Sequence, residues 1–246
     1  MKPLYFVSDL HLGTRGDESR RERFLAFLTG IRDRASGLFI LGDLFEFGFE
    51  YRHGLTARNR AIAEELARVA KSGVRVALVR GNHDCWLRER FSRAYGIELL
   101  DSPSELELEG RRVLLSHGDE LDRSFKTRVT SALFRSRVAN SLFELLPERL
   151  GSRLAGVIAG MSRASRIKPK LVKALSDFAR ERLQNAFDCV ILGHVHVPTC
   201  ERVGPGTYLN TGDWITHFTY GVMDEQGLAL RRFPTGEPAR PEAAKT

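Results

Sequence analysis

The chain has 246 residues, of which 42% are hydrophobic and 28% are charged, and its formal net charge is +7. A chain of this length can bury a full core, and α/β enzymes of this size are often single domains. Its three cysteines lack paired spacing, which argues against a disulfide framework and a zinc finger. No apolar stretch reaches the roughly 18 residues of a membrane span. The first apolar run starts too early for a secretory signal, so we expect a cytoplasmic protein.

The positive charge is concentrated in one region. Residues 121–185 contain 14 Lys and Arg against 5 Asp and Glu, a net +9, which leaves the rest of the chain at −2. Such a basic region requires an anionic partner or another explanation.

The first predicted strand is Leu4–Val7, a run of large apolar residues typical of a buried parallel strand. It is followed by Asp9 and His11. Because these two residues are at positions i and i+2, we expect their side chains to point to the same side. One such pair means little, since a metal needs at least a third ligand.

The same pattern, an apolar run that ends in potential metal ligands, occurs four more times along the chain. The runs and the residues that follow them are 38–41 with Gly42-Asp43, 74–79 with Gly81-Asn82-His83-Asp84, 112–115 with His117-Gly118-Asp119, and 190–192 with Gly193-His194-Val195-His196. Any one of these histidines alone is more often structural. Because all five motifs follow apolar runs in the same way, they predict one shared site.

The remaining elements follow from hydrophobic periodicity. Helices are expected at about 19–33, 56–71 and 87–95, a hairpin at 105–108 and 111–116, a strand at 208–210, and an antiparallel pair at 219–223 and 228–233. The aromatic segment 45–51 fits either a lipid pocket or core packing. The tail 234–246 is expected to be disordered.

Residues 126–183 have a helical apolar period throughout, broken at Pro147, Gly151 and Pro169. We expect an insertion of about 121–185 that forms a cap over the site within a single domain, 1–233. The alternative is that these helices pack on the sheet as crossovers, although a crossover needs only about a dozen residues.

The candidate ligands are carboxylates, an amide and imidazoles, with no thiolate. They are Asp9, His11, Asp43, Asn82, His117, His194 and His196. With waters and substrate oxygens they suffice for two divalent cations that share one carboxylate. This ligand set favours Mn²⁺ or Fe²⁺, while Zn²⁺ or Co²⁺ also fit.

The ordered motifs together resemble the signature of the calcineurin-like metallophosphoesterases. The resemblance implies an α/β fold, a β-sandwich flanked by helices. It also implies one metal on Asp9, His11, Asp43 and His196, and a second on Asp43, Asn82, His117 and His194. By the same resemblance, His83 would face the scissile phosphate as general acid or charge stabiliser, and Asp84 would orient His83.

Finer features resemble the UDP-2,3-diacylglucosamine diphosphatases of lipid A synthesis. These features are Gly42–Phe47, the helical insertion after Asp119, and Gly212-Asp213-Trp214. Those enzymes release UMP and 2,3-diacylglucosamine 1-phosphate at the membrane face. The chain departs from the best-known branch at His83, where that branch has Arg, and looks closer to a His-bearing sister branch.

Such a substrate would suit a basic helical cap. Arg163, Arg166 and Lys168 are candidates for substrate phosphate contacts beside Asn82 and His83, and the cap would meet an anionic membrane surface. We therefore expect a protein peripheral to the inner membrane. The alternative for each basic residue is a solvated face. His53 and His217 have no motif context.

Three rival functions remain. A nucleotide phosphodiesterase using a nucleic-acid partner would need aromatic stacking positions, but the aromatics near the basic region all fit a core, so no nucleic acid is expected. A phosphatase of small phosphate esters would use the helices for packing only. A non-catalytic scaffold would be expected to lose metal ligands, and this chain has all of them. The sequence does not indicate an oligomeric state.

Overall fold

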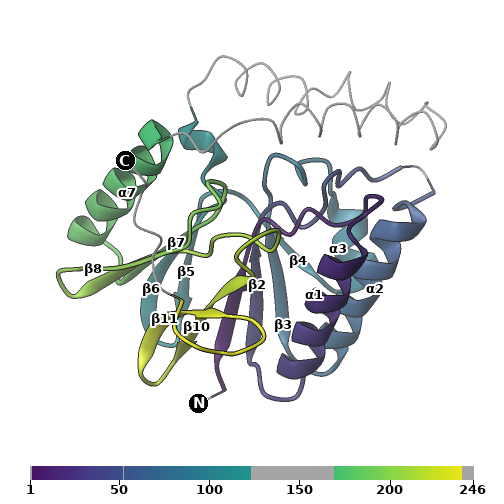
Figure 1. The fold of residues 1–246 in the computed structure, drawn as a ribbon, viewed down its shortest axis with the longest axis horizontal. Coiled ribbons are helices and arrows are strands. Elements are labelled where there is room, and N and C mark those ends of the chain that lie inside the picture. The colour runs from purple at the N-terminus through teal and green to yellow at the C-terminus, as the bar shows by residue number, and fades with distance from the viewer. Residues whose placement is uncertain (1, 52, 123–168, 240–246) are drawn as a thin grey trace.

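The computed structural model describes residues 2–51, 53–122 and 169–239. These residues form two packed β-sheets with helices on their outer faces, which confirms the predicted α/β sandwich (Figure 1). The cap expected within 121–185 lies mostly outside the described residues.

The first sheet has six strands and its centre is parallel. In spatial order the strands are β11 (Gly227–Arg232), β10 (Thr219–Asp224), β1 (Leu4–Val7), β2 (Gly37–Leu41), β3 (Arg75–Val79) and β4 (Glu98–Leu100). β1 to β4 are parallel, and β10 and β11 form the predicted antiparallel pair at one edge. The carboxyl ends of β1, β2 and β3 therefore meet at one edge of the sheet.

The second sheet has five strands. Their order is β5 (Ser104–Leu108), β6 (Arg111–Leu115), β7 (Cys189–Leu192), β9 (Gly206–Asn210) and β8 (Thr199–Val203). β5 and β6 form the predicted hairpin, while β6, β7 and β9 are parallel. The loops that follow β6 and β7 thus begin at the same edge of this sheet.

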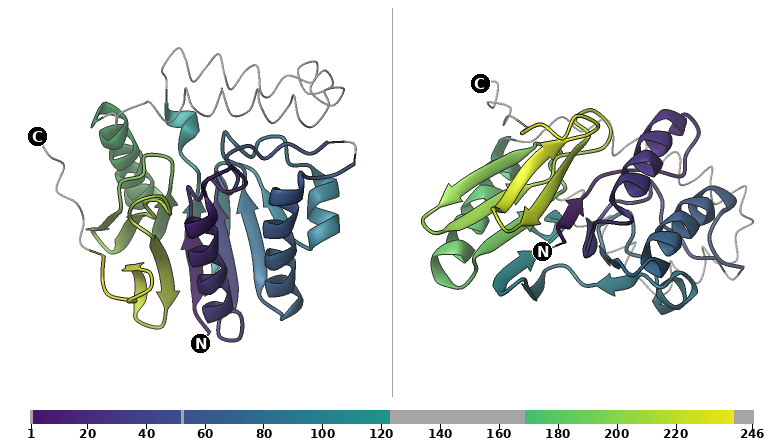
Figure 2. Two further views of the ribbon diagram at one scale, coloured as in Figure 1. Left: turned by 45° about the vertical axis from the view of Figure 1, so that its right-hand side comes forward. Right: turned by 90° about the horizontal axis from the view of Figure 1, so that it is seen from below.

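Helices cover the outer face of each sheet, as the two views of Figure 2 show. On the six-stranded sheet these are α1 (Glu18–Ile31), α2 (Ala57–Lys71) and α3 (Glu89–Tyr95), each within two residues of its predicted limits. Thr56 caps the N-terminus of α2 by accepting the Asn59 N–H, and Gly96 ends α3 in the left-handed conformation. A short 3₁₀ turn, η1 (Asp119–Leu121), follows β6.

The two faces of each central strand contribute to different cores. In β1, Phe6 faces the second sheet, where it packs with Phe39, Ile191 and Leu209, whereas Val7 faces the α1–α2 layer. A run of apolar residues without alternation is what a strand buried on both faces requires.

Helix α7 (Pro169–Asn185) corrects the predicted boundary of the cap. Its buried residues Leu175, Ala179 and Leu183 pack on β7 and β9 of the second sheet. The last part of the expected insertion is therefore a crossover helix between β6 and β7. Helical periodicity alone could not tell a crossover helix from a cap helix, because both have one apolar face.

Two other expectations differ from the structure. The short strands β4 and β8 were not predicted, because their residues are only half-buried and lack a clear apolar pattern. The beginning of the tail is ordered: Pro238 forms a bridge with Arg231, and the Ala239 N–H donates to the Leu230 carbonyl.

All three cysteines are free. Within the part of the chain that the structure describes, no helix is both long and apolar enough to cross a bilayer.

Phe39 provides a test of the packing between the sheets. Its ring stacks on that of Phe6 at a centroid distance of 5.3 Å, and both side chains are fully buried. We expect Phe39→Ala to lower the free energy of unfolding by about 3–5 kcal/mol, measured by urea denaturation. Leu99→Ala, in the half-buried edge strand β4, should lower it by only about 1 kcal/mol. Equal losses in the two variants would contradict this assignment of the core.

Candidate metal centre

The loops that follow β1 and β2 are joined by their backbones. The Asp9 N–H donates to the Gly42 carbonyl at 3.2 Å, and the N–H groups of Leu10 and His11 both donate to the Asp43 carbonyl at 2.9 Å. The strand β1 ends at Val7, so the expectation that Asp9 and His11 share one side of a strand is wrong. A sharp turn of the chain, rather than strand alternation, brings the two side chains into one site.

The backbone of this turn is unusual. Seven non-glycine residues of the described chain have a positive φ, and five of them are candidate ligands, namely Asp9, His11, Asp43, His194 and His196. The left-handed region is disfavoured for residues with a Cβ, and such residues cluster at functional sites.

Asp43 lies at the centre of the site and is 2% exposed. Its Oδ2 faces the Nε2 atoms of three imidazoles, at 3.4 Å from His117, 3.7 Å from His11 and 3.9 Å from His83. Its Oδ1 accepts the backbone N–H of His83 at 3.1 Å. Burial alone would raise the pKa of Asp43, but the charges of His117 and His83 hold this pKa well below its usual value.

Asp9, the second buried carboxylate, binds the loop after β7. Its Oδ2 accepts the backbone N–H of His194 at 2.9 Å and also the Ser8 hydroxyl. Its Oδ1 lies 3.2 Å from the Nε2 of His196 and 3.8 Å from that of His11. Burial would raise the pKa of Asp9, but His196 lowers it.

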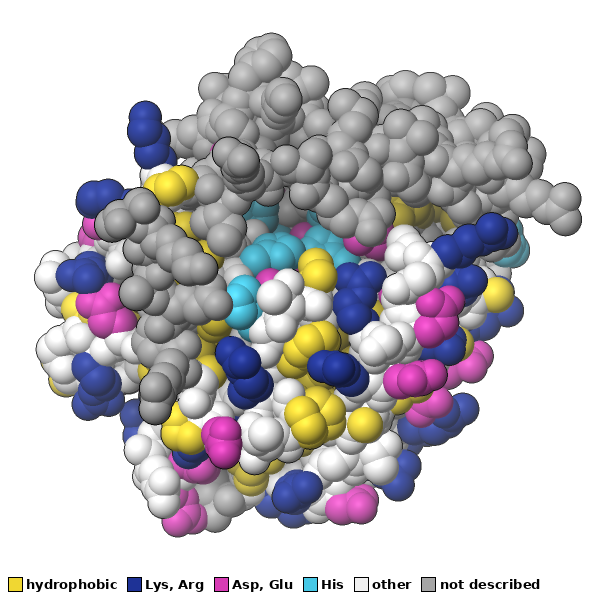
Figure 3. All heavy atoms as spheres, in the orientation of Figure 1, with side chains coloured by type: hydrophobic (Ala, Val, Ile, Leu, Met, Phe, Trp, Pro, Cys, Tyr) yellow, Lys and Arg dark blue, Asp and Glu magenta, His cyan; other side chains and the backbone are white. Residues whose placement is uncertain are grey.

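His117, Asn82 and His194 form the other side of the site. The Nε2 of His117 lies 3.3 Å from Asn82 Oδ1 and 3.2 Å from His194 Nδ1. The structure thus brings all seven predicted ligands together from the ends of β1, β2, β3, β6 and β7. Figure 3 shows histidine side chains gathered on one face of the molecule.

Four of the five imidazoles, those of His11, His83, His117 and His196, have an oxygen facing Nδ1 at 2.7–3.5 Å, although for His11 this is an electrostatic contact and no hydrogen bond. His117 Nδ1 contacts the Leu41 carbonyl at 2.8 Å, and His11 Nδ1 lies 3.5 Å from the Glu46 carboxylate. His196 Nδ1 lies 3.5 Å from Asp213 Oδ2. Their Nε2 atoms therefore face the centre, and His194, which presents Nδ1 to His117, is the exception. Such outer contacts fix the tautomer and orientation of a metal-binding histidine.

Burial lowers the pKa of His11 to about 3 and that of His194 to about 4. Both imidazoles are therefore neutral at pH 7, with a lone pair to offer. Burial would also lower the pKa of His196, but the Asp9 and Asp213 carboxylates raise it to about 10. For His117, burial is outweighed by Asp43 and Asp9, so its pKa lies well above the usual value. The carboxylates thus favour positive charge at His117 and His196, and a bound cation would take its place.

The donor set fits divalent cations. Asp9 Oδ1 and both ring nitrogens of His11 are buried without a hydrogen-bond partner in the described structure. Ligand atoms lie within 4.8 Å of one another in three groups, which are Asp9–His11–His196, Asp9–Asp43–His117 and His11–Glu46–His83. Oxygen and imidazole donors at this spacing suit octahedral divalent metals.

Asp84, which was expected to orient His83, accepts backbone N–H groups instead of contacting the His83 ring directly. His83 Nδ1 contacts the Glu46 carbonyl at 2.7 Å, and its Nε2 faces Asp43. Asp84 accepts the N–H groups of Leu44 at 2.7 Å and Phe45 at 3.2 Å, so it holds the loop whose next carbonyl contacts His83. Burial, and then the Asp43 charge, raise the pKa of Asp84 to about 7.

Sequence reasoning missed two carboxylates at the site, Glu46 and Asp213. Glu46 is 2% exposed and its side chain contacts His11, while Asp213 is 3% exposed and contacts both His196 and His217. Each belongs to a stretch that sequence reasoning singled out without giving the carboxylate a role, 42–47 and 212–214. The signal available in the sequence was an acidic residue within or next to each of these motifs.

Two further predictions concern three substrate-binding residues and the aromatic segment 45–51. Arg163, Arg166 and Lys168 are outside the described residues. The aromatic segment is mainly core, because Phe45, Phe49 and Tyr51 are almost fully buried, whereas Phe47 is half-buried.

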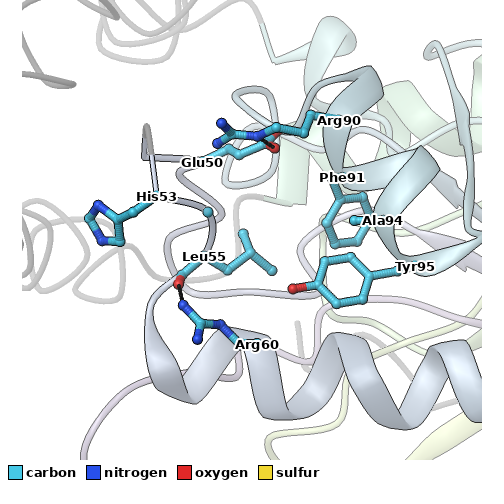
Figure 4. A pocket seen from close by; sticks show the side chains of 9 residues that line it. Glu50, His53, Leu55, Arg60, Arg90, Phe91, Ala94 and Tyr95 are labelled. Atoms are coloured by element: carbon cyan, nitrogen blue, oxygen red, sulfur yellow. Dashed lines mark hydrogen bonds and ion pairs between the residues drawn. The ribbon is translucent and has the colours of Figure 1, made fainter.

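A cavity of about 300 Å³ lies elsewhere, between α2, α3 and the segment 50–55 (Figure 4). Leu55 and Phe91 form its apolar part, the Glu50–Arg90 ion pair lies on one side, and Arg60 donates to the Leu55 carbonyl. None of the described site residues lines this cavity.

The family model for calcineurin-like phosphoesterases matches residues 2–198. The chain is 32% identical over 220 residues to a UDP-2,3-diacylglucosamine hydrolase of Neisseria meningitidis, covering 87% of this chain and 90% of the relative. The protein with the same description from Porphyromonas gingivalis is 31% identical, with 92% and 96% covered. For that of Pseudomonas fluorescens the identity is 30%, with 96% and 97% covered.

Among solved structures, the phosphoesterase Yfce from E. coli matches with a TM-score of 0.51 and 21% identity, covering 97% of each chain. Vacuolar Protein Sorting 29 from Cryptosporidium parvum matches with a TM-score of 0.50 and 13% identity, covering 97% of this chain and 94% of that one. At these identities the likeness shows the fold alone.

Gly81 provides a test of how tightly the backbone surrounds Asp43. A Cβ at this position would lie 2.4 Å from Asp43 Oδ1 and 2.8 Å from Asp43 N. We expect Gly81→Ala to displace the carboxylate and to weaken divalent metal binding by about tenfold or more, measured by equilibrium dialysis with metal analysis. The control Gly30→Ala adds a Cβ that meets only Arg34 at 3.8 Å and should bind metal normally. Normal binding by Gly81→Ala would show that Asp43 is not confined as described.

Proposed function

The chain belongs to the calcineurin-like phosphoesterase family, and from this membership we propose that the centre around Asp43 holds two divalent cations and hydrolyses a pyrophosphate. The protein is a metal-dependent hydrolase. The observation that supports the proposal best is that five further ligand-type side chains gather around the two buried carboxylates of Asp9 and Asp43.

Each metal would have four protein ligands. Asp9, His11, Asp43 and His196 would hold one ion, and Asp43, Asn82, His117 and His194 would hold the other. The choice of Asp43 as the shared ligand is supported by its central place between His11 and His117. The ligand types favour Mn²⁺. When bound, the metals would lower the pKa of water and neutralise charge on the phosphoryl oxygens.

His83 would contact the scissile phosphate. Because its Nδ1 faces the Glu46 carbonyl, its Nε2 is directed into the centre, where it can donate a proton to the leaving oxygen or stabilise its charge. Asp84 would act indirectly, by fixing the backbone of Leu44 and Phe45 ahead of that carbonyl. Asn82 would contact the phosphate in addition to a metal.

The proposed substrate is UDP-2,3-diacylglucosamine, cleaved to UMP and 2,3-diacylglucosamine 1-phosphate in lipid A synthesis. The proposal is supported by relatives that have this hydrolase description and match over at least 87% of the chain. A lipid-linked substrate would bring the protein to the cytoplasmic face of the inner membrane. There the basic segment 121–185 would meet anionic lipid headgroups, and Arg163, Arg166 and Lys168 would contact substrate phosphates.

A substrate panel tests this choice. With Mn²⁺ and detergent, we expect the highest kcat/KM for UDP-2,3-diacylglucosamine, because acyl chains and nucleotide contribute binding energy far from the reacting bond. Other nucleotide-sugar pyrophosphates, cyclic nucleotides and bis-p-nitrophenyl phosphate are the comparison. A higher kcat/KM for a soluble ester or a nucleotide would replace the lipid substrate with one of the rival functions.

His83→Ala tests the role of the imidazole. We expect metal content to stay unchanged and kcat to fall by ~10²–10⁴, because the leaving oxygen loses its proton donor or its charge stabiliser. Metal content is measured by elemental analysis and kcat on the preferred substrate. The control His53→Ala removes an exposed histidine that contacts Tyr51 and should keep full activity. Full activity in metal-loaded His83→Ala would remove the proposed role.

A further inference from the structure

Asp213 has two oxygens with separate contacts. Its Oδ1 accepts three backbone N–H groups, from Ile215 at 2.8 Å, Thr216 at 2.6 Å and His217 at 3.1 Å. Its Oδ2 faces two imidazoles, with His217 Nδ1 at 2.9 Å and His196 Nδ1 at 3.5 Å. The first oxygen fixes the turn 213–217, which leaves the second free to face His196.

The turn is attached to the loop of Asp9. The Trp214 N–H donates to the Asp9 carbonyl at 3.2 Å, and the Ser8 hydroxyl contacts Thr211 Oγ1 at 2.6 Å. The Trp214 ring is fully buried against Phe24 and Phe27 of α1. Asp213 is therefore placed by a rigid frame, as a residue that orients a ligand must be.

His196 depends on such support more than His11, His83 or His117. Its side chain is 31% exposed, against 0% for His117, 7% for His11 and 11% for His83. His117 and His11 are confined by the atoms that bury them, whereas the His196 side chain is partly exposed to solvent. Without a partner at Nδ1, its ring would be free to rotate away from Asp9.

We infer that Asp213 is a positioning residue that holds His196 with Nε2 directed at the metal centre, and that His217 fixes the same carboxylate oxygen, Oδ2. The inference rests on the proposed function, in which His196 is a ligand. Asp213 lies beyond the family-model match at 2–198, so the family match assigns it nothing.

Asp213→Asn separates the two contacts. The amide oxygen can still accept the three backbone N–H groups, while the carboxylate oxygen that faces His196 becomes an amide donor. We expect one of the two Mn²⁺ affinities to fall by about 10–100-fold and the other to stay unchanged, measured by a titration with EPR detection of free Mn²⁺. The matched control Asp188→Asn also changes a carboxylate that accepts a backbone N–H, that of Arg112 at 2.8 Å, far from His196. It should keep both affinities.

The outcomes distinguish the inference from the proposed function. Failure of the unmodified protein to bind two Mn²⁺ ions would contradict the proposed function itself. Two normal affinities in Asp213→Asn, whatever its melting temperature, would overturn the inference alone.

A measurement on the unmodified protein gives an independent test. In the Zn²⁺-loaded protein, long-range ¹H–¹⁵N spectra report which nitrogen of each imidazole is protonated, and His196→Gln identifies the His196 signals. We expect a proton on Nδ1 of His196, donated to Asp213. A proton on Nε2 would overturn the inference even if the Asp213 variant failed to fold.

Discussion

The buried negative charge at one edge of the sandwich is the constraint on which the site depends. Asp9, Asp43 and Glu46 are each at most 2% exposed. An ionised carboxylate in a protein interior costs several kcal/mol unless charges or hydrogen-bond donors compensate it. Backbone N–H groups and imidazoles supply part of this compensation. Divalent cations bound as proposed would supply the rest, so the arrangement would favour cation binding at the expense of the stability of the fold.

The backbone of the site also carries an energetic cost that the surrounding structure offsets. A left-handed conformation costs a residue with a Cβ about 1–2 kcal/mol, and five candidate ligands adopt it. The hydrogen bonds between the loops of Asp9 and Asp43 hold two of these residues in place, and Asp9 in turn holds His194 through its N–H. The conformations persist because each loop is fixed by the next. These hydrogen bonds between the loops fix the side chains, and such preorganisation would lower the entropy lost on metal binding.

The sequence predicted that the seven candidate side chains come together, because each follows an apolar run and the ends of parallel strands meet at one edge. It mispredicted how Asp9 and His11 come together, since a left-handed turn leaves no mark in hydrophobic periodicity. It also missed Asp213, because the partners of a lone acid far along the chain are decided by packing. The α7 boundary was wrong for a similar reason: its apolar face is the same whether it covers a sheet or a site.

Neither sheet contains the whole site. Asp9 and Asp43 follow strands of the six-stranded sheet, whereas His117, His194 and His196 follow strands of the other. The distance of 3.4 Å between Asp43 and His117 is therefore set by how the two sheets pack through their shared core. A cation held by both residues would join the sheets and, because it binds only the packed state, would stabilise that packing by mass action. With Asp43 and His117 as proposed ligands, metal affinity would therefore depend on sheet packing, and residues deep between the sheets would influence the chemistry without touching the substrate.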